Sequence, residues 1–164
     1  MDPACVLVVN AGSSSIRFAL YDVAEPLLPH LRGKIERIGL PGTALTVDGS
    51  TGARAQGRPI DARDHSGAAS ALIDWLEEAG VLAAVKAVGH RVVHGGSRYS
   101  APARVGDELM QELRRISAYS SEHLPGEIDL IERFSRRFRS VPQVACFDTA
   151  FHRDMPRVAQ LLPI

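Results

Sequence analysis

Near its start the chain reads Val6-Leu7-Val8-Val9-Asn10-Ala11-Gly12-Ser13-Ser14-Ser15-Ile16-Arg17-Phe18-Ala19-Leu20, which places two β-favouring runs on either side of a short polar turn. The first run, residues 6–9, is almost continuously apolar and predicts a strand buried on both faces. The second run, residues 16–21, alternates and predicts a strand with one buried face, formed by Ile16, Phe18 and Leu20. The stretch therefore predicts a β-hairpin.

The turn of this hairpin, residues 10–15, gathers serine hydroxyls, an asparagine amide and several backbone N–H groups at one point. Such a concave set of donors suits a phosphate, and Arg17 can point to the same side as Ser15 and add positive charge. Glycine and serine are also ordinary turn residues, so a plain polar turn fits the same letters. A P-loop is excluded, because the Gly-x-x-x-x-Gly-Lys-Ser/Thr pattern is absent.

Composition limits the class of protein. The chain has 164 residues, 45% of them hydrophobic and 23% charged, which is enough for one core. Its 19 basic and 19 acidic residues cancel, so no overall field steers it to nucleic acid or to an anionic membrane. It also lacks an apolar run of the roughly 20 residues that a membrane span needs.

Two further features indicate the compartment. The N-terminus, Met-Asp-Pro-Ala-Cys, has no basic region of the kind that begins a signal peptide. Both cysteines, Cys5 and Cys146, lie in apolar, strand-like runs, which is typical of buried, reduced thiols. We therefore expect a cytoplasmic protein.

The rest of the chain predicts an α/β layered domain, since strands come first and helices and strands then alternate. We expect strands at residues 31–38, 85–93 and 144–147. Residues 39–57 are expected to form a hairpin and surface loop without chemistry, with an alternating piece at 44–47. A helix capped by Asp64 or Ser66 is expected to run to about residue 79 and to end at Gly80, and two more helices are expected from residues 107 and 125. The basic end of the last helix is expected to be a solvated face rather than a nucleic-acid site; it carries Arg133, Arg136, Arg137 and Arg139.

The segment Gly89-His90-Arg91-Val92-Val93-His94-Gly95-Gly96 has the features of a strand end. Period two then places Arg91 and Val93 on one face and the two histidines on the other. An arginine fork beside a small apolar side chain forms a cup for a short carboxylate. A surface arginine with two core or turn histidines is the plainer interpretation, and a metal pair is less favoured than either.

Two more residues lie where α/β proteins bind ligands. His123 directly precedes a helix, where it can donate to an anion or simply cap the turn. Asp148 follows a buried strand, and an aspartate there commonly holds a metal or a reacting oxygen, although it can also cap the next turn.

Together these segments resemble the acetate kinases, within the actin-like sugar-kinase superfamily. The resemblance rests on residues 9–18, on residues 89–96 and on Phe147-Asp148-Thr149-Ala150-Phe151-His152. It implies a ribonuclease H-like, actin-like ATPase domain, with a mixed β-sheet and flanking helices. It also implies phosphoryl transfer between ATP and acetate with Mg²⁺, giving acetyl phosphate and ADP.

On the nucleotide side, the resemblance assigns Asn10 to the magnesium site, and Ser13 and Ser15 to the phosphate loop. Arg17 stands where the family usually has a lysine that contacts ATP. Arginine keeps the positive charge but replaces a compact donor by a planar fork.

On the acyl side, the resemblance assigns Arg91 to the substrate carboxylate and Val93 to the methyl pocket. His123 would contact the transferring phosphoryl group, and Asp148 would be the catalytic aspartate. Glu122 replaces a leucine of the methyl pocket. A carboxylate there would repel acetate and suits an apolar wall poorly, so acetate or another short-chain carboxylate is expected.

Acetate kinases are two-domain chains that are much longer than this one. The resemblance therefore implies that residues 1–164 are an N-terminal domain without the nucleotide-binding second domain. The chain would be either a truncated product or one half of a split enzyme completed by a separate C-terminal chain, and we expect it to be inactive alone. A non-catalytic module that binds acyl phosphate or docks a partner is an alternative. A Ser-His-Asp hydrolase using Ser13 or Ser15, His123 and Asp148 is a remote one, because no Gly-x-Ser-x-Gly elbow is present.

Overall fold

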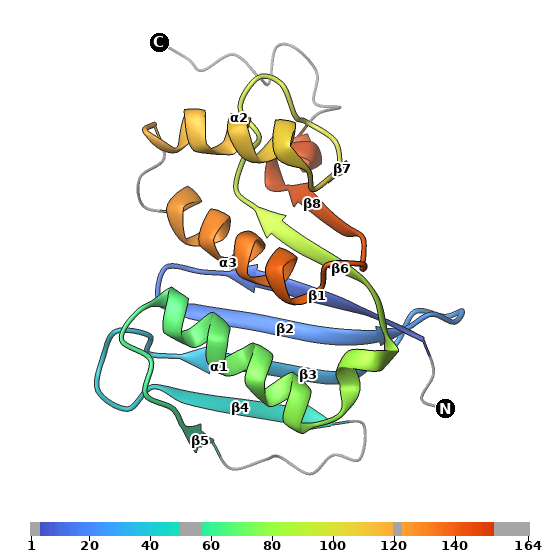
Figure 1. Ribbon diagram of the computed structural model, residues 1–164, viewed down its shortest axis with the longest axis vertical. Coiled ribbons are helices and arrows are strands. Elements are labelled where there is room, and N and C mark those ends of the chain that lie inside the picture. Colours follow the sequence, from blue (N-terminus) through green and yellow to red (C-terminus); the bar gives the residue numbers. More distant parts are fainter. Residues whose placement is uncertain (1–3, 50–56, 120–122, 153–164) are drawn as a thin grey trace.

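A computed structural model describes residues 4–49, 57–119 and 123–152 and shows one mixed β-sheet with helices (Figure 1). The strands lie in the order β5-β4-β3-β2-β1-β6-β8-β7. Strands β1 to β5 pair antiparallel in sequence, β1, β6 and β8 run parallel, and β7 is antiparallel to β8. Their bounds are β1 Cys5–Ala11, β2 Ser15–Asp22, β3 Pro29–Glu36, β4 Ala44–Gly49, β5 Arg58–Pro59, β6 Val85–Val92, β7 Ala103–Arg104 and β8 Gln143–Phe147.

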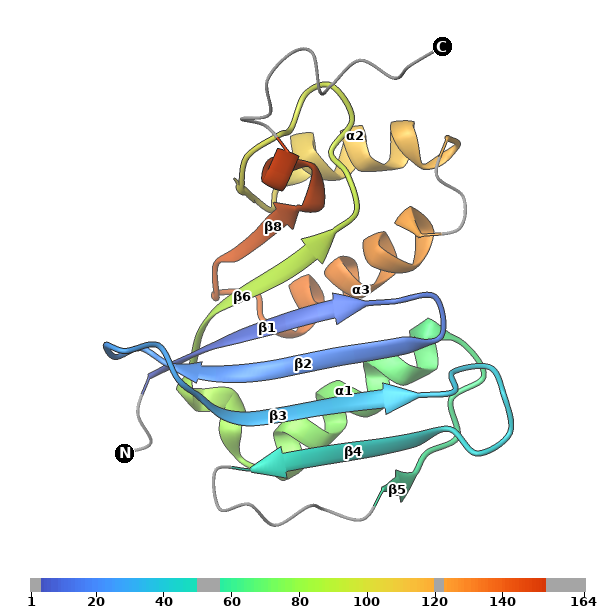
Figure 2. The same ribbon diagram turned by 180° about the vertical axis from the view of Figure 1, so that it is seen from behind.

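The α-helices are α1 (His65–Glu78), α2 (Asp107–Ser117) and α3 (Leu124–Arg137), and the short helices η1 (Val81–Ala84) and η2 (Asp148–His152) are 3₁₀. Helices α1 and α3 cover one face of the sheet, and the opposite face is open in the part of the chain that the structure describes (Figure 2). None of the described helices combines the length and the hydrophobicity of a membrane-spanning segment. The predicted α/β architecture is confirmed.

Local signals set the ends of α1 as the sequence predicts. The Asp64 carboxylate caps the helix by accepting a hydrogen bond of 2.7 Å from the backbone N–H of Gly67. After the helix, Gly80 adopts a left-handed backbone with φ of 72°, a conformation that glycine reaches without steric cost.

Because one face of the sheet is open, two predictions about buried side chains, in β1 and in β8, are wrong. In β1 only Cys5, Leu7, Val9 and Ala11 are buried, whereas Val8 is 37% exposed, so burial on both faces is wrong for this strand. The prediction that Cys146 is buried is wrong too, because β8 turns Ala145 and Phe147 inward and leaves Cys146 exposed. In both strands alternate side chains point away from the helices.

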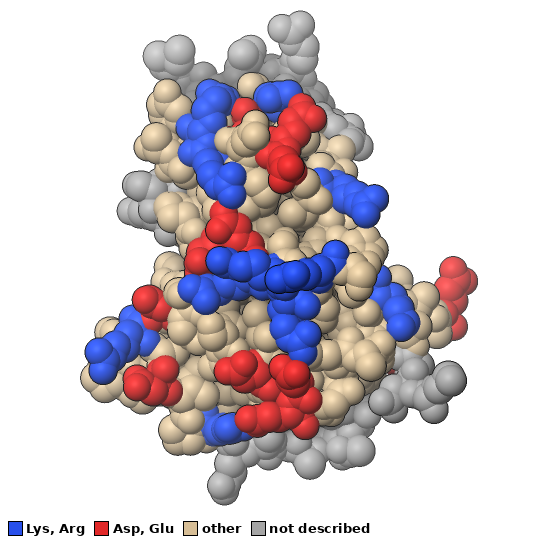
Figure 3. Space-filling view, in the orientation of Figure 1, with Lys and Arg blue, Asp and Glu red and all other residues tan. Residues whose placement is uncertain are grey.

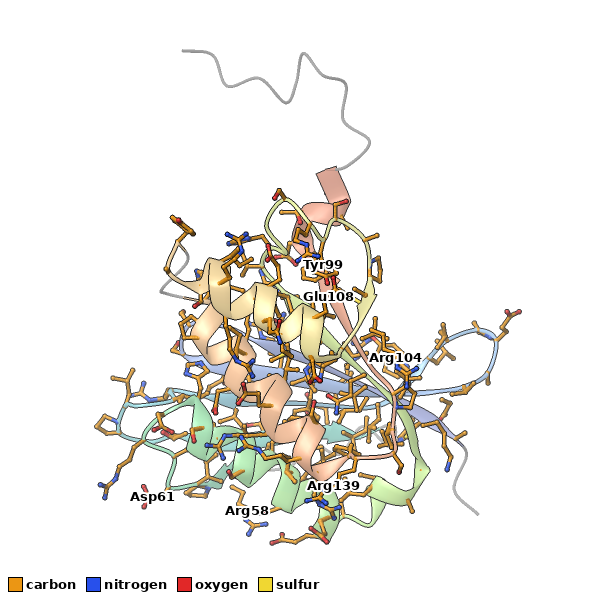
Figure 4. All side chains as sticks on the ribbon, turned by 45° about the horizontal axis from the view of Figure 1, so that its top comes forward. Arg58, Asp61, Tyr99, Arg104, Glu108 and Arg139 are labelled. Atoms are coloured by element: carbon orange, nitrogen blue, oxygen red, sulfur yellow. The ribbon has the colours of Figure 1, made fainter. Side chains whose placement is uncertain are left out.

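The core consists of two clusters. The larger lies between the sheet and α1, where Phe18 contacts Trp75 with ring centroids 5.7 Å apart. The ring of Phe18 also lies over Gly33, where any β-carbon would overlap it. The smaller cluster joins α2, α3, β6 and β8. Tyr99, labelled in Figure 4, packs against it and stacks on its member Phe147 with centroids 6.0 Å apart.

The basic end of α3 lies on the surface, as predicted. Basic side chains form a band across the middle of the helix-covered face (Figure 3). Arg137 pairs with Glu77 at 2.8 Å, and Arg133 pairs with Asp129 at 2.8 Å and donates to the hydroxyls of two α1 serines, Ser66 and Ser70. These arginines therefore have structural partners.

His90 is a buried core histidine, as the plainer interpretation of its segment predicts. Its side chain is 1% exposed, its Nε2 lies 2.7 Å from Gln143 Oε1, and its Nδ1 has no partner among the described residues. The ring meets Phe134 edge-on. Burial disfavours the charged imidazolium and lowers the pKa of His90 to about 4, against a weaker opposite effect of the Gln143 hydrogen bond.

This burial predicts a loss of stability in acid. The unfolded chain, with an ordinary histidine pKa near 6.5, binds a proton between pH 6.5 and 4 that the folded chain does not. The free energy of unfolding should therefore fall by about 3 kcal/mol between pH 7 and pH 4 on account of His90. Urea unfolding across this range measures it, with His90→Gln as the control, since glutamine places a donor near Nε2 and does not titrate. Equal slopes for the two proteins would contradict the assignment.

Candidate functional site

Parallel strands bring the predicted site residues to one edge of the sheet. The carboxyl ends of β1, β6 and β8 point the same way, and α3 begins beside the end of β6 (Figure 1). Ligands of α/β proteins bind outside this edge of a parallel sheet. The turn after β1, the segment after β6, the start of α3 and the start of η2 therefore surround a common region.

Three of the predicted residues lie side by side on adjacent strands. In the sheet register Arg17 is opposite Asn10, Asn10 is opposite Arg91, and Arg91 is opposite Cys146. Neighbouring strands are about 4.8 Å apart, and residues in register point to the same face. All four side chains lie on the open face, so two cations flank one amide there.

The serine turn is tied down by its backbone. Gly12 N–H donates to the Ser15 carbonyl at 2.7 Å, and the Ser14 carbonyl accepts from Ile38 N–H at 3.1 Å. His65 Nε2 lies 2.7 Å from the Gly12 carbonyl, which can only accept, so Nε2 carries the proton. The side chain of Ser13 is exposed and that of Ser15 is half-buried. A role in binding phosphate stays a prediction for both serines.

Arg91 and Asp148 form a two-pronged ion pair across the site. Arg91 Nε donates to Asp148 Oδ1 at 3.0 Å, and Arg91 Nη2 donates to Oδ2. The aspartate raises the pKa of Arg91, so the guanidinium stays charged. The side chains are 35% and 45% exposed, and water screens a pair of this kind. Asp148 thus accepts hydrogen bonds from Arg91, and a ligand carboxylate would have to compete with it.

Glu127, in the first turn of α3, is a site residue that the sequence analysis does not identify. Its side chain is 2% exposed, both of its oxygens lie 3.2 Å from the backbone N of Val93, and one lies 3.9 Å from Arg91 Nη1. Burial raises its pKa, while the Val93 N–H and the charges of Arg91 and His123 oppose that rise. An acidic residue near a helix start usually marks only the helix dipole, so the sequence carries no signal for this contact.

His123 precedes α3 without making a side-chain cap, so the capping alternative is not observed for its side chain. Its carbonyl accepts a hydrogen bond from Glu127 N–H at 3.2 Å. Across the described ranges, no hydrogen bond links His123 to a serine of the turn or to Asp148, as a hydrolase triad would require. The roles of His123 and Val93 in a reaction stay predictions.

A histidine metal pair at His90 and His94 finds no support. His90 is in the core, and His94 Nδ1 accepts from Gly96 N–H at 3.2 Å within its own turn. Among residues 4–49, 57–119 and 123–152, no group of three or more His, Cys, Asp or Glu side chains could hold a metal ion. Glu122 lies outside the described residues.

Comparison with known proteins gives a consistent result. The family model of the acetokinase family matches residues 5–164. The chain is 40% identical to an acetate kinase of Deinococcus radiodurans over 153 residues, which is 93% of this chain, and 36% identical to a propionate kinase of Citrobacter rodentium over 97% of this chain. It spans only 38% and 40% of the length of these two curated relatives.

Solved structures agree with the sequence matches. A propionate kinase from Francisella tularensis superposes with a TM-score of 0.82 at 30% identity, over 94% of this chain and 39% of that protein. Porphyromonas gingivalis acetate kinase gives the same TM-score at 27% identity, over 94% of this chain and 40% of that protein.

The exposure of Cys146 on the open face predicts selective thiol reactivity. Ellman's reagent should modify one thiol per native chain and two in denaturant, because Cys5 is buried. Cys146→Ser should abolish the reaction of the native chain and leave one thiol in denaturant. A native chain that shows no reactive thiol would contradict the exposed position.

Proposed function

The chain belongs to the acetokinase family, and we propose that it forms the N-terminal part of a kinase that transfers a phosphoryl group between ATP and a short-chain carboxylate. The observation that supports this most is the position of Arg91, at the carboxyl edge of the sheet and next to Asn10 on the open face. Arg91, Asp148 and the serine turn are the parts on which the proposed reaction depends.

In this proposal Arg91 binds the substrate carboxylate and Val93 contacts its alkyl group. The guanidinium fork matches the two oxygens of a carboxylate, and it is already positioned by Asp148 and by the end of β6. When the substrate binds to Arg91, the hydrogen bonds between Arg91 and Asp148 break. The carboxylate of Asp148 then becomes available to the reacting groups. A substrate carboxylate is ionised at neutral pH, so Asp148 acts as an orienting group more than as a base.

The phosphates of the nucleotide are assigned to the serine turn and Arg17. Phosphoryl transfer requires mainly in-line positioning and neutralisation of the oxygens that carry charge. The reaction brings two anions together, and this costs energy unless cations lie between them. Arg17 and Arg91, on either side of Asn10 in the sheet register, supply two such cations. His123, at the start of α3, would donate to the transferring phosphoryl group.

Magnesium fits this site as an ion that arrives with the nucleotide. Such ions commonly use one or two protein oxygens together with phosphate oxygens and water, so a cage of three acidic side chains is not needed. Asn10 and Asp148 are the residues that would hold it, and it would neutralise charge on the transferring group. ATP as a substrate also favours a cytoplasmic location.

The acyl group is proposed to be acetate, with propionate as a second candidate. Curated relatives and solved neighbours include enzymes named for each acid. We propose further that a second domain completes the nucleotide site, because the chain spans 38–40% of the length of these relatives. A non-catalytic module that binds acyl phosphate is the alternative outcome.

The proposal predicts activity only in the presence of the second part. The chain alone, with ATP, Mg²⁺ and acetate, should give no steady acyl phosphate, measured as the hydroxamate. Adding the C-terminal part of the Deinococcus radiodurans acetate kinase should produce turnover that depends on acetate or propionate. A mixture that binds acetyl phosphate without turnover would favour the non-catalytic module.

Arg91→Ala in the same mixture should raise the KM for acetate about 10- to 100-fold, as expected for the loss of charge-assisted hydrogen bonds to a carboxylate. Arg104→Ala is the matched control, because Arg104 is exposed on β7 (Figure 4) and pairs with Val144 near the start of β8 rather than at its carboxyl end. Equal effects of the two substitutions would contradict the assignment of Arg91.

A further inference from the structure

Two carboxylates among the described residues are buried, Glu112 and Glu127, and their partners differ. Glu112 pairs with Arg115 at 2.7 Å and faces Arg98 at 3.8 Å, so two exposed arginines balance its charge. Glu127 has no arginine at hydrogen-bond distance within the described ranges. Its oxygens instead accept from a single backbone N–H, that of Val93.

This contact fixes the end of the strand that carries Arg91. Val93 directly follows β6, where its N–H has left the strand ladder, and Glu127 supplies an acceptor for this part-buried N–H. Val93 is two residues from Arg91, so the period of a strand predicts that their side chains share a face. A shift of the Val93 backbone would therefore displace both groups proposed to bind the substrate.

Whereas this hydrogen bond supports the proposed carboxylate site, the negative charge of Glu127 opposes the binding of a carboxylate there. Arg91 lies between two carboxylates, Asp148 at hydrogen-bond distance and Glu127 at 3.9 Å. A substrate carboxylate would be a third anion around one guanidinium. Glu127 attracts Arg91 across this 3.9 Å, and its charge would repel a carboxylate bound to the same guanidinium. His123 and Arg91 are the basic groups that face Glu127, and Asp148 is the acidic one.

We propose that Glu127 is a positioning residue of the carboxylate site, in which hydrogen-bond acceptance from Val93 holds Arg91 and Val93 in place while the negative charge weakens carboxylate binding. The role rests on the proposed function, because it takes Arg91 as the group that binds the substrate carboxylate. A purely structural glutamate would affect folding but would not separate these two effects.

Two substitutions of Glu127 separate the effect of its hydrogen-bond acceptance from the effect of its negative charge. Glu127→Gln keeps an acceptor oxygen of the same reach and removes the charge. Glu127→Met keeps the length of the side chain and removes both. Glu112→Gln is the control, since it neutralises the other buried carboxylate, on a different helix and with its own arginine partners.

The experiment measures acetate binding by the full chain and hydrogen exchange of the Val93 amide, both by NMR at constant ionic strength. We expect Glu127→Gln to bind acetate about three- to tenfold more tightly than the wild type and to keep the protection of Val93. Glu127→Met should bind acetate more weakly and exchange the Val93 amide at least tenfold faster. Glu112→Gln should change neither quantity.

Weaker or unchanged acetate binding by Glu127→Gln would overturn the charge effect, and this variant decides the point even if Glu127→Met does not fold. Unchanged Val93 exchange in a folded Glu127→Met would overturn the positioning role. Absence of acetate binding from the wild type and from Glu127→Gln alike would contradict the proposed function and the charge effect together. Equal binding by all variants would overturn only the role of Glu127.

Discussion

The parallel pairing of β1 with β6 is the constraint on which the site depends. It places Asn10 next to Arg91, although four strands, β2 to β5, and the helices α1 and η1 lie between them in the sequence. Antiparallel pairing of β1 with β2 adds Arg17 on the other side of Asn10. Because a shift by one residue would turn every side chain of a strand to the opposite face, the helix-covered core fixes this register.

Much of the fold could be predicted from local patterns. The hairpin, α1 with Asp64 and Gly80 at its ends, and the helical faces of α2 and α3 follow from periodicity and capping. Burial on both faces of β1 could not be inferred correctly, because an apolar residue such as Val8 does not show whether a helix covers it. The exposure of Cys146 has the same cause.

The candidate site could be predicted only where a motif carries it. Arg91 and Asp148 belong to separate motifs of the sequence, and the structure joins them in one ion pair. The contact of Glu127 with Val93 and that of His65 with Gly12 depend on how α3 and α1 pack on the sheet. No spacing in the sequence encodes either contact, since each joins segments that are more than thirty residues apart.

The hydrogen bond from His65 to the Gly12 carbonyl connects the serine turn to helix α1. His65 is the first residue of α1, and two serines of the same helix accept hydrogen bonds from Arg133 of α3. Helix α3 also carries Glu127, which accepts a hydrogen bond from the backbone N–H of Val93, directly after β6. The serine turn and the end of β6, which carries Arg91, are thus both anchored to the packed pair of helices α1 and α3. A displacement of one of these two segments is therefore transmitted to the other through the helices.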